Sequence, residues 1–404
     1  MALSRTITAA DARHVLARVH GFEPSGLTEG KDGTKAVFIR HQCVQSDPIE
    51  VAGRNADLTL HSRVANYRPQ FLIDLLYDER RLFEYFCKML SIMPVELYPI
   101  FKHKMKAFAK QKRIVSFFKN YRKETTLVLN ALEKGPVSPR DLNDMGKMEW
   151  GWGHRANLSN IILSRLWVSG RAMIYDRNGA AKYYALPEKV IPKKILHADP
   201  PRKGEDLMEI AKTIVKASRL VMPGDSPEQW FEVGKTKNVR EILQELERRG
   251  DLFSVQLEGS KDKFYAPVED FAEWENPEPP KDTYVRFLAP LDPLLWSRRV
   301  FRMIYGREYI WEVYKRPKDR KYGYYCLPVI FNGDYAGLIE PFLRKKDRVL
   351  EIRNFHILDT NIVRNRFLVA LSREMKRFCG YMTAERTEVK RSPRWASEAL
   401  EIVM

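Results

Sequence analysis

The pattern of apolar and polar positions gives one order of elements twice. The first copy begins with the helical pattern KETTLVLNALEKG, which ends at Gly135. Ser138 and Pro139 are residue types typical of a helix cap and a first helical position, so a second helix is predicted there. A longer helix is predicted over HRANLSNIILSRLWVSG, and two strands then meet at Asn178-Gly179, a typical hairpin turn.

The second copy repeats this order. It begins with the helix EDLMEIAKTIVKASRLVM, restarts at Ser226-Pro227, and continues with the helix TKNVREILQELERRG, which ends at Gly250. Strand, turn and strand are again predicted, over DLFSVQLEGSKDKFYAPVE. Three helices and a hairpin within roughly 75 residues are the order of a winged helix, whose third helix can enter a DNA groove. The same fold also serves as a protein-interaction module, so both uses stay open.

The two ends of the chain have different patterns. The opening helices of a further copy are predicted in TITAADARHVLARVHGF and KDGTKAVFIRHQCV. After a Pro-rich linker at 277–280, alternating segments with turns such as Asn332-Gly333-Asp334 predict a small antiparallel sheet or partial barrel, closed by a helix over SREMKRFCGYM.

The expected fold class is therefore α+β, with tandem winged-helix (helix-turn-helix) domains and a small C-terminal antiparallel β-domain. The expected winged helices cover 1–110, 111–196 and 197–276, and the β-domain with its closing helix covers 277–404.

The net positive charge of the sequence indicates a class of binding partner. Lys and Arg exceed Asp and Glu by 69 − 52 = 17, and the sequence pI is about 9.5. This excess favours a polyanionic partner, either nucleic acid or an acidic membrane surface. Residues 101–123, FKHKMKAFAKQKRIVSFFKNYRK, carry nine Lys/Arg and no acid. Their spacing predicts one helix with a packed face and a cationic face, which lies along a phosphate backbone or simply faces solvent.

Cysteines and apolar runs indicate the compartment. The four cysteines, Cys43, Cys87, Cys326 and Cys379, form no CxxC pair, so neither a disulfide framework nor a zinc site is predicted. No apolar run reaches the ~18 residues of a membrane-spanning helix, and MALSRTITAADARHV lacks the apolar core of a signal peptide. We expect a cytoplasmic, nucleoid-associated protein of bacterial type with no membrane partner.

Familiar catalytic signatures are missing from the sequence, namely HExxH, GxSxG, the P-loop and GxGxxG. One short stretch, HQCVQSDPIEVAGRN, places Gln45 and Asp47 two residues apart, with Pro48 after them. On an extended segment these two side chains lie on the same side. Asp before Pro is also a common turn start, and Asp47 can cap a following helix. The local pattern leaves a structural and a catalytic role open.

Several blocks, in order, resemble one known family. Its glutamine–any–aspartate motif and the segment after it resemble VQSDPIEVAGRNADLTLHSRV, its next block resembles RRLFEYFCKMLSIMPVELYP, and its second winged helix resembles RDLNDMGKMEWGWGHR. Its C-terminal blocks are similar to FLAPLDPLLWSRRVFRMIYGREYIWEVY, KYGYYCLPVIFNGDYAGLIEP and DRVLEI. The resemblance spans about residues 8–358 and is to the winged-helix DNA glycosylases of the YcaQ/AlkZ type.

This chain departs from the family pattern at three places. Ser46 replaces an apolar residue within the motif, Phe86-Cys87-Lys88 replaces tryptophan–any–histidine, and Glu340 replaces an aspartate.

The resemblance implies a metal-independent DNA glycosylase without a cofactor, which hydrolyses the N-glycosidic bond of N7-alkylated purines and unhooks interstrand crosslinks. Asp47 would activate a water and stabilise an oxocarbenium-like transition state, and Gln45 would orient that water. One branch of the family has a second glutamine in place of the aspartate, so Asp47 resembles the YcaQ-like branch.

The implied partner is double-stranded DNA with alkylated or crosslinked bases, bound by a monomer. The candidate DNA contacts are Arg54, His154, Arg155, Asn157, Arg177, Asn178, Lys261 and Lys263. Each is also readable as an ordinary surface, turn or helix-start residue. The rival hypothesis is a non-catalytic winged-helix regulator or damage sensor, and a membrane-surface protein is a weaker third, because the basic runs lack a broad Trp/Leu-rich face.

Overall fold

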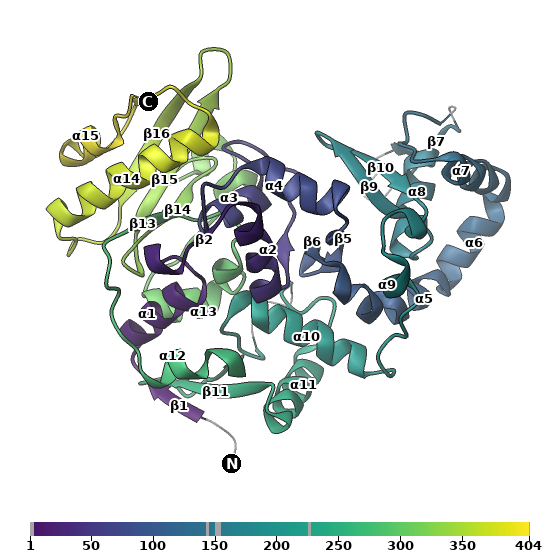
Figure 1. Ribbon diagram of the computed structural model, residues 1–404, viewed down its shortest axis with the longest axis horizontal. Helices are drawn as coiled ribbons and strands as arrows, with labels where there is room; N and C mark the ends of the chain where they lie inside the picture. Colours follow the sequence, from purple (N-terminus) through teal and green to yellow (C-terminus); the bar gives the residue numbers. More distant parts are fainter. Residues whose placement is uncertain (1–3, 143–144, 150–154, 225–227, 404) are drawn as a thin grey trace. The chain divides into compact units, whose positions relative to one another are not determined.

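The structure is a computed structural model that describes residues 4–142, 145–149, 155–224 and 228–403. The chain forms two compact units (Figure 1). The first unit comprises Met1–Leu72, Cys87–Ser91 and Ala211–Met404, and the second comprises Ile73–Phe86 and Ile92–Ile210. Each unit is therefore built from segments that are distant in the sequence.

The first unit holds most of the regular elements. Its helices are α1 (Ala9–Val19), α2 (Gly30–His41), α3 (Asn55–His61), most of α4 (Pro69–Ile73), the C-terminal half of α10 (Glu205–Ser218), α11 (Thr236–Arg249), α12 (Phe271–Glu275), α13 (Arg298–Tyr305), α14 (Arg364–Met382) and α15 (Ser397–Leu400). Its strands are β1 (Ser4–Ile7), β2 (Thr28–Glu29), β3 (Val44–Gln45), β4 (Val64–Ala65), β11 (Leu252–Leu257), β12 (Lys263–Pro267), β13 (Val285–Phe287), β14 (Leu327–Phe331), β15 (Asp334–Arg344), β16 (Val349–Ile357) and β17 (Arg386–Val389).

Five strands form the largest sheet, in the order β13-β14-β15-β16-β17. The predicted turn at Asn332-Gly333 is confirmed: it joins β14 to β15, and both residues have positive φ, 49° and 91°. The expectation of a wholly antiparallel sheet is wrong at one edge, because β17 pairs with β16 in parallel. The reason is the long helix α14, which carries the chain from the end of β16 back to its start.

The closing helix α14 covers this sheet (Figure 1). It contributes Phe367, Leu371, Met375 and Phe378, all fully buried, to a core shared with apolar residues of β13 to β16. Ala52 belongs to the same core, although it lies only five residues after Asp47. The β-domain core therefore also holds the segment that follows the Gln45–Asp47 motif.

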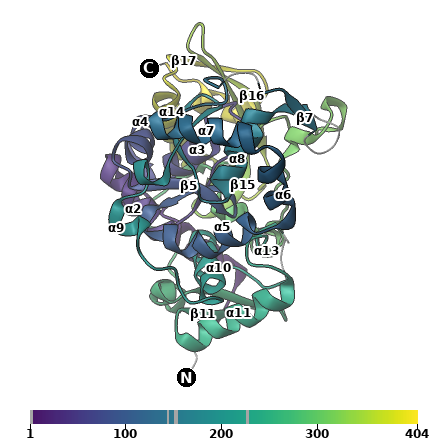
Figure 2. The ribbon, with the colours of Figure 1, turned by 90° about the vertical axis from the view of Figure 1, so that its right-hand side faces the viewer.

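A second core joins the N-terminal segment 7–22 to apolar residues between positions 220 and 338. Thr8 caps helix α1, because its hydroxyl accepts a hydrogen bond from the Asp11 amide at 3.0 Å. Helix α1 packs against α12 and α13. Strand β1 pairs in parallel with β11, which forms the predicted hairpin with β12. Helix α11 lies beside β11 in both views (Figures 1 and 2).

The second unit contains the basic segment. Its elements are β5 (Leu82–Cys87) without its last residue, the second half of β6 (Met89–Pro94), α5 (Lys102–Ala109), α6 (Lys112–Asn120), α7 (Arg122–Lys134), β7 (Lys147–Glu149), β8 (Arg155–Asn157), α8 (Leu158–Val168), β9 (Met173–Asn178), β10 (Ala181–Ala185) and α9 (Lys193–Leu196). The hairpin predicted at Asn178-Gly179 is confirmed, and Gly179 takes φ +58°.

Three predictions in this half of the chain are wrong in detail. The basic run 101–123 is not one helix, because the chain breaks at Lys110–Gln111 between α5 and α6 and again before α7. No helix starts at Ser138, since its hydroxyl and the Asp141 carboxylate close a turn instead, at 3.2 and 2.7 Å. The predicted helix 154–170 begins only at Leu158, because Arg155–Asn157 pairs as a strand with β7. The restart at Ser226-Pro227 lies outside the described residues.

The core under α14 gives a direct stability prediction. We expect Leu371→Ala to lower the free energy of unfolding by about 2–5 kcal/mol, because it leaves a cavity between α14 and the sheet. Val369→Ala, on the exposed side of the same helix, is the matched control and should change it by less than about 0.5 kcal/mol. Urea denaturation measures both, and equal effects of the two variants would contradict the observed packing.

Candidate active site and nucleic-acid surface

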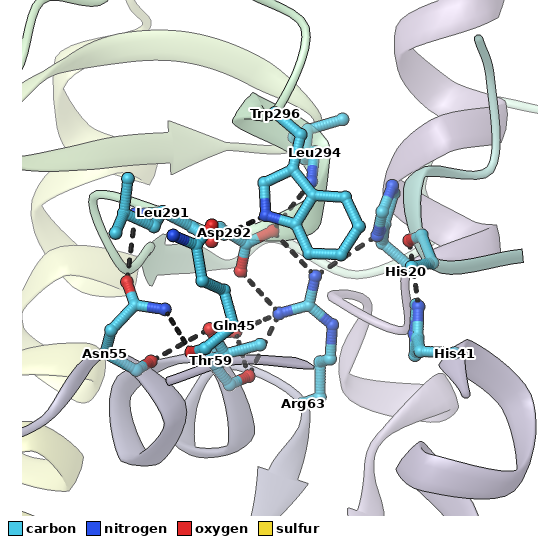
Figure 3. A network of polar contacts seen from close by, with 12 residues as sticks. His20, His41, Gln45, Asn55, Thr59, Arg63, Leu291, Asp292, Leu294 and Trp296 are labelled. Carbon is cyan, nitrogen blue, oxygen red and sulfur yellow. Dashed lines mark hydrogen bonds and ion pairs between the residues drawn. The ribbon is translucent and has the colours of Figure 1, made fainter. Parts of the chain in front are cut away.

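The Gln45–Asp47 segment is held from several sides within the first unit. The Ser46 amide donates to the Leu90 carbonyl at 2.9 Å, which ties the segment to the start of β6. The Asn55 side chain donates to the Gln45 carbonyl at 2.9 Å, and its own oxygen accepts from the Leu291 amide at 2.9 Å. One asparagine thus joins the motif to the loop before α13 (Figure 3). The backbone of Gln45 is therefore fixed before any ligand binds.

The Gln45 side chain is buried, with 6% of the residue exposed, and extends toward Trp296 and the Leu291–Asp292 segment (Figure 3). Its oxygen Oε1 accepts no hydrogen bond from any residue that the structure describes. A buried acceptor without a partner costs roughly 1–3 kcal/mol. A water or ligand that donates to this oxygen would recover that energy.

Asp47 is half-buried and stands in a turn. Its Oδ1 accepts from the Ile49 amide at 2.9 Å, so the turn expected from Asp-Pro is present. The alternative, that Asp47 caps the following helix, is wrong, because α3 starts at Asn55 with Arg54 at its cap position. Burial raises the pKa of Asp47, and the Ile49 amide only partly opposes this effect. A carboxylate with a raised pKa is a stronger base than an ordinary surface aspartate.

A fully buried ion pair lies beneath the motif. Arg63 and Asp292 face each other in two parallel hydrogen bonds, of 2.7 and 2.8 Å, and both side chains are at most 1% exposed. Arg63 also donates to the Thr59 carbonyl at 2.9 Å and to the Ser62 hydroxyl at 2.8 Å. The pair joins the segment after α3 to the segment before α13, 229 residues later (Figure 3).

Two buried histidines complete this network. The second guanidinium nitrogen of Arg63 lies 3.1 Å from His20 Nδ1, and His20 stacks on His41 at 5.3 Å between ring centroids. Burial lowers the pKa of both histidines well below the usual range, and the charges of Arg63 and Arg219 lower it further. Both rings are therefore neutral at physiological pH, and His20 Nδ1 accepts the Arg63 hydrogen bond.

The residues just after the motif are anchored to α14. Gly53 has φ +102°, and a Cβ there would collide with the Tyr381 hydroxyl. Arg54, a predicted DNA contact, donates to Asp57 at 2.6 Å and is 35% exposed. The other Asp57 oxygen accepts from Tyr67 at 2.6 Å. Arg54 therefore takes the ion-pair role that the sequence left open, while part of its side chain stays accessible.

Of the other predicted DNA contacts in the first unit, Lys261 and Lys263 stand on the β11–β12 hairpin. Lys261 is exposed in the connecting loop. Lys263 donates to Glu247 at 2.7 Å and lies 5.1 Å from the Tyr265 ring.

In the second unit, Arg155 and Asn157 are exposed on β8, immediately before α8. Arg177 is bound to Glu84, with contacts of 2.9 and 2.5 Å, so its guanidinium is already occupied. Asn178 is exposed at the β9–β10 turn, and His154 lies outside the described residues. The sequence-predicted contacts are thus divided between the two units.

A basic hollow in the second unit was not predicted as such. It has a volume of about 590 Å³ and lies between α5 and the start of α10. The lysines that line it are Lys104, Lys106, Lys110 and Lys203, and Asp206 is the one acidic residue among the lining residues described. The hollow combines part of the basic run 101–123 with Lys203, a shape and charge suited to a phosphate group.

Sequence reasoning missed the residues that hold the motif in place, which are Asn55, Arg63, Asp292 and Trp296. Each lies within a block that resembles the family, yet nothing local marks Arg63 and Asp292 as partners.

The departure at Lys88 places a buried lysine 5.9 Å from the Trp296 ring. Burial lowers the pKa of this lysine.

Comparison with known proteins decides what kind of molecule this is. A family model described as "DNA glycosylase AlkZ-like" matches residues 40–381, which include the motif, the ion pair and most of the β-domain. The chain belongs to this family. Streptomyces sahachiroi DNA glycosylase AlkZ is similar in structure, with a TM-score of 0.64 and 15% sequence identity over 96% of this chain and 100% of that one. At that identity the likeness concerns the fold.

Two further findings concern the described residues of this AlkZ-like chain. None of their helices is both long enough and apolar enough to span a membrane. Nor do they contain a group of three or more His, Cys, Asp or Glu side chains placed to hold a metal ion.

Breaking the buried ion pair should be costly. We expect Asp292→Ala to lower the free energy of unfolding by about 3–5 kcal/mol, because the buried Arg63 charge loses its partner. The control is Asp334→Ala, which breaks the partly exposed pair with Arg13 (2.6 Å, with the Asp334 side chain 44% exposed) and should cost at most about 1 kcal/mol. Urea denaturation of both variants checks this, and a mild effect of Asp292→Ala would show that the pair contributes little.

The buried histidines make stability depend on pH. Burial lowers the pKa of His20, His41 and His61 in the folded chain. In the unfolded chain these histidines have the ordinary pKa of about 6.5. The unfolded state therefore binds more protons below that pH. The free energy of unfolding should fall between pH 7 and 5.5, by up to about 1.4 kcal/mol per pH unit for each histidine.

His61→Phe isolates one contribution to this slope. The His61 ring nitrogens have no hydrogen-bond partner among the described residues, and the ring packs against Tyr381 at 4.7 Å. Phenylalanine keeps the aromatic contact and cannot be protonated. Denaturation at several pH values should give a shallower slope for this variant, and an unchanged slope would contradict the assignment.

Proposed function

We propose that this AlkZ-like chain is a DNA repair glycosylase that hydrolyses the N-glycosidic bond of N7-alkylated purines and unhooks crosslinks formed at that position. The supporting observation is the Gln45–Asp47 segment itself. It combines a half-buried carboxylate of raised pKa with a buried amide oxygen that has no hydrogen-bond partner among the described residues, on a backbone fixed by Asn55. Such a pair is suited to hold and activate one water.

The proposed chemistry needs little from the enzyme at the leaving group. Alkylation at N7 makes the purine cationic, so the bond between C1′ and N9 breaks with its electron pair passing to the base, which becomes neutral. Asp47 stabilises the positive charge that develops on the sugar and takes one proton from the attacking water. The water oxygen bonds to C1′ and leaves an abasic site. Gln45 Oε1 accepts the other water proton in a hydrogen bond, and no step requires a metal.

Binding of duplex DNA by a monomer is part of the proposal. The three winged helices proposed over 1–110, 111–196 and 197–276 are supported by the confirmed hairpins β9–β10 and β11–β12, which follow the helices α8 and α11. Exposed Arg155, Asn157, Asn178 and Lys261, the accessible part of Arg54 and the lysines of α5 are the proposed backbone contacts. The proposal includes membership of the YcaQ-like branch, and Asp47, where the other branch has a second glutamine, supports it. A cytoplasmic location at the nucleoid follows from the same proposal.

The catalytic assignment is tested with a duplex that carries one N7-methylguanine, by measuring abasic sites under single-turnover conditions. We expect Asp47→Asn to reduce the rate about 10²- to 10⁴-fold, because the amide cannot accept the proton yet keeps the hydrogen bond from Ile49. Gln45→Ala should also reduce it. Asp78→Asn, at an exposed carboxylate, is the control and should leave the rate unchanged.

A crosslinked duplex provides the second substrate, with separation of the strands as the readout. Tight duplex binding by the wild-type protein without release of either lesion would instead favour a non-catalytic damage sensor. Full activity of Asp47→Asn would refute the role given to the carboxylate.

A further inference from the structure

A polar hollow lies on the β-domain, separate from the Gln45–Asp47 segment. Its volume is about 750 Å³. Three segments line it, namely the loop 317–324, the paired strands β15 and β16 at Glu340 and 353–357, and residues 391–393. All three belong to the first unit. We call this hollow the β-domain groove.

Positive charge prevails in the β-domain groove. Arg320, Lys321, Arg353 and Arg391 line it, whereas Glu340 is the one acidic residue among the described residues that do so. Glu340 is buried and accepts hydrogen bonds from the Tyr324 amide at 2.6 Å, the Tyr325 amide at 3.3 Å and the Asn354 side chain. Its oxygens are thus turned to the protein, and the cations dominate the surface that a ligand meets.

Aromatic rings alternate with these cations. Tyr322, Tyr324 and His356 all line the groove and are half-buried. The Arg320 guanidinium lies 4.7 Å from the centroid of the Tyr324 ring, and the Tyr322 ring meets His356 edge-on at 5.3 Å. Proteins that bind single-stranded nucleic acid commonly combine cations along its phosphate backbone with aromatic rings on which its bases stack.

The loop that carries these residues is held rigidly. The buried Glu312 carboxylate accepts from the backbone amides of Lys321, Tyr322 and Gly323 at 3.0, 2.7 and 3.3 Å. Burial opposes ionisation of Glu312, but these amides and the Lys315 ammonium outweigh it and lower its pKa to about 2. The loop is therefore ordered without a ligand, which reduces the entropy lost on binding.

The same loop connects the β-domain groove to the candidate active site. Tyr325 follows directly after Tyr324 but is buried. Tyr325 belongs to the same core as Ala52, and Ile49, two residues after Asp47, packs against that core. Burial and the carboxylates of Asp47 and Glu50 raise the pKa of Tyr325. One short stretch of chain thus has a tyrosine in the groove and the next tyrosine near the proposed catalytic carboxylate.

We propose that the β-domain groove binds an unpaired segment of DNA, with phosphates on Arg320, Lys321, Arg353 and Arg391 and a base stacked on Tyr324. This inference rests on the proposed function. A glycosylase must expose its target nucleotide, and unpaired bases next to the lesion are then available to this groove. An acidic peptide would use the cations but has no use for the rings, so the aromatic residues favour DNA.

The test measures binding of fluorescein-labelled octathymidine to the full chain by anisotropy, as salt is varied. The double substitution Arg353→Gln/Arg391→Gln should weaken binding about tenfold and lessen the slope of log K against log salt by about 1.4, since two cations are removed. The control Arg366→Gln/Arg373→Gln removes the same charge from the exposed face of α14 and should change binding less than twofold. Equal effects of both pairs would overturn the groove site.

Stacking is tested separately with an abasic octamer of the same length. Tyr324→Leu should weaken octathymidine binding about 5- to 100-fold and leave the abasic octamer unaffected. Equal loss for both oligomers would refute stacking. If the groove substitutions weaken binding of an oligoglutamate peptide but leave octathymidine binding unchanged, the partner is an acidic peptide and the DNA proposal is refuted.

Base release from N7-methylguanine distinguishes this inference from the proposed function. If the wild-type chain releases no base, but octathymidine binding depends on the groove as described, the glycosylase proposal fails while the groove stands. If release occurs and octathymidine binding is insensitive to every groove substitution, only the groove proposal fails.

Discussion

The buried ion pair between Arg63 and Asp292 is the contact on which the candidate active site depends. It connects the segment that follows Gln45 and Asp47 to the loop that carries Leu291 and Trp296. Both charges are removed from water, so each is tolerable only while the other is in place. The Thr59 carbonyl, the Ser62 hydroxyl and His20 accept further hydrogen bonds from the guanidinium, and His41 stacks on His20. The geometry of the motif therefore depends on two segments that lie 229 residues apart in the sequence.

The β-domain supports the motif in a second way. Ala52 is buried in its core, and the Tyr381 hydroxyl of α14 occupies the space that a side chain at Gly53 would need. Asp47 is thus followed within six residues by two positions fixed by the closing helix and its sheet. A small sheet that carries no proposed catalytic residue therefore helps to position the proposed catalytic carboxylate, as a rigid scaffold does for loops in other enzymes.

Local signals explain which parts of this fold are predictable from sequence. The Asn178-Gly179 and Asn332-Gly333 turns were found because their backbone conformation demands those residue types. The predicted helix start at Ser138 is wrong, since a serine or aspartate that caps a helix equally closes a turn. The start predicted for α8 is too early, because Arg155–Asn157 pairs as a strand with β7. The spacing of Gln45 and Asp47 is visible locally, but the choice of a catalytic role for them rests on the family resemblance. Arg63 and Asp292 were not paired, because a contact across 229 residues leaves no periodic trace in either segment.

That separation also has a consequence for synthesis. A ribosome adds about 5–20 residues per second, so Arg63 waits on the order of 10 to 50 s for Asp292 to be made. During this interval the segment bearing Gln45 and Asp47 has neither its counter-ion nor the sheet that buries Ala52. Ile73–Phe86 and Ile92–Ile210 emerge earlier and have a core of their own. The nascent chain can therefore form the proposed DNA-contacting lysines of α5 before it can assemble the site proposed to cleave a glycosidic bond.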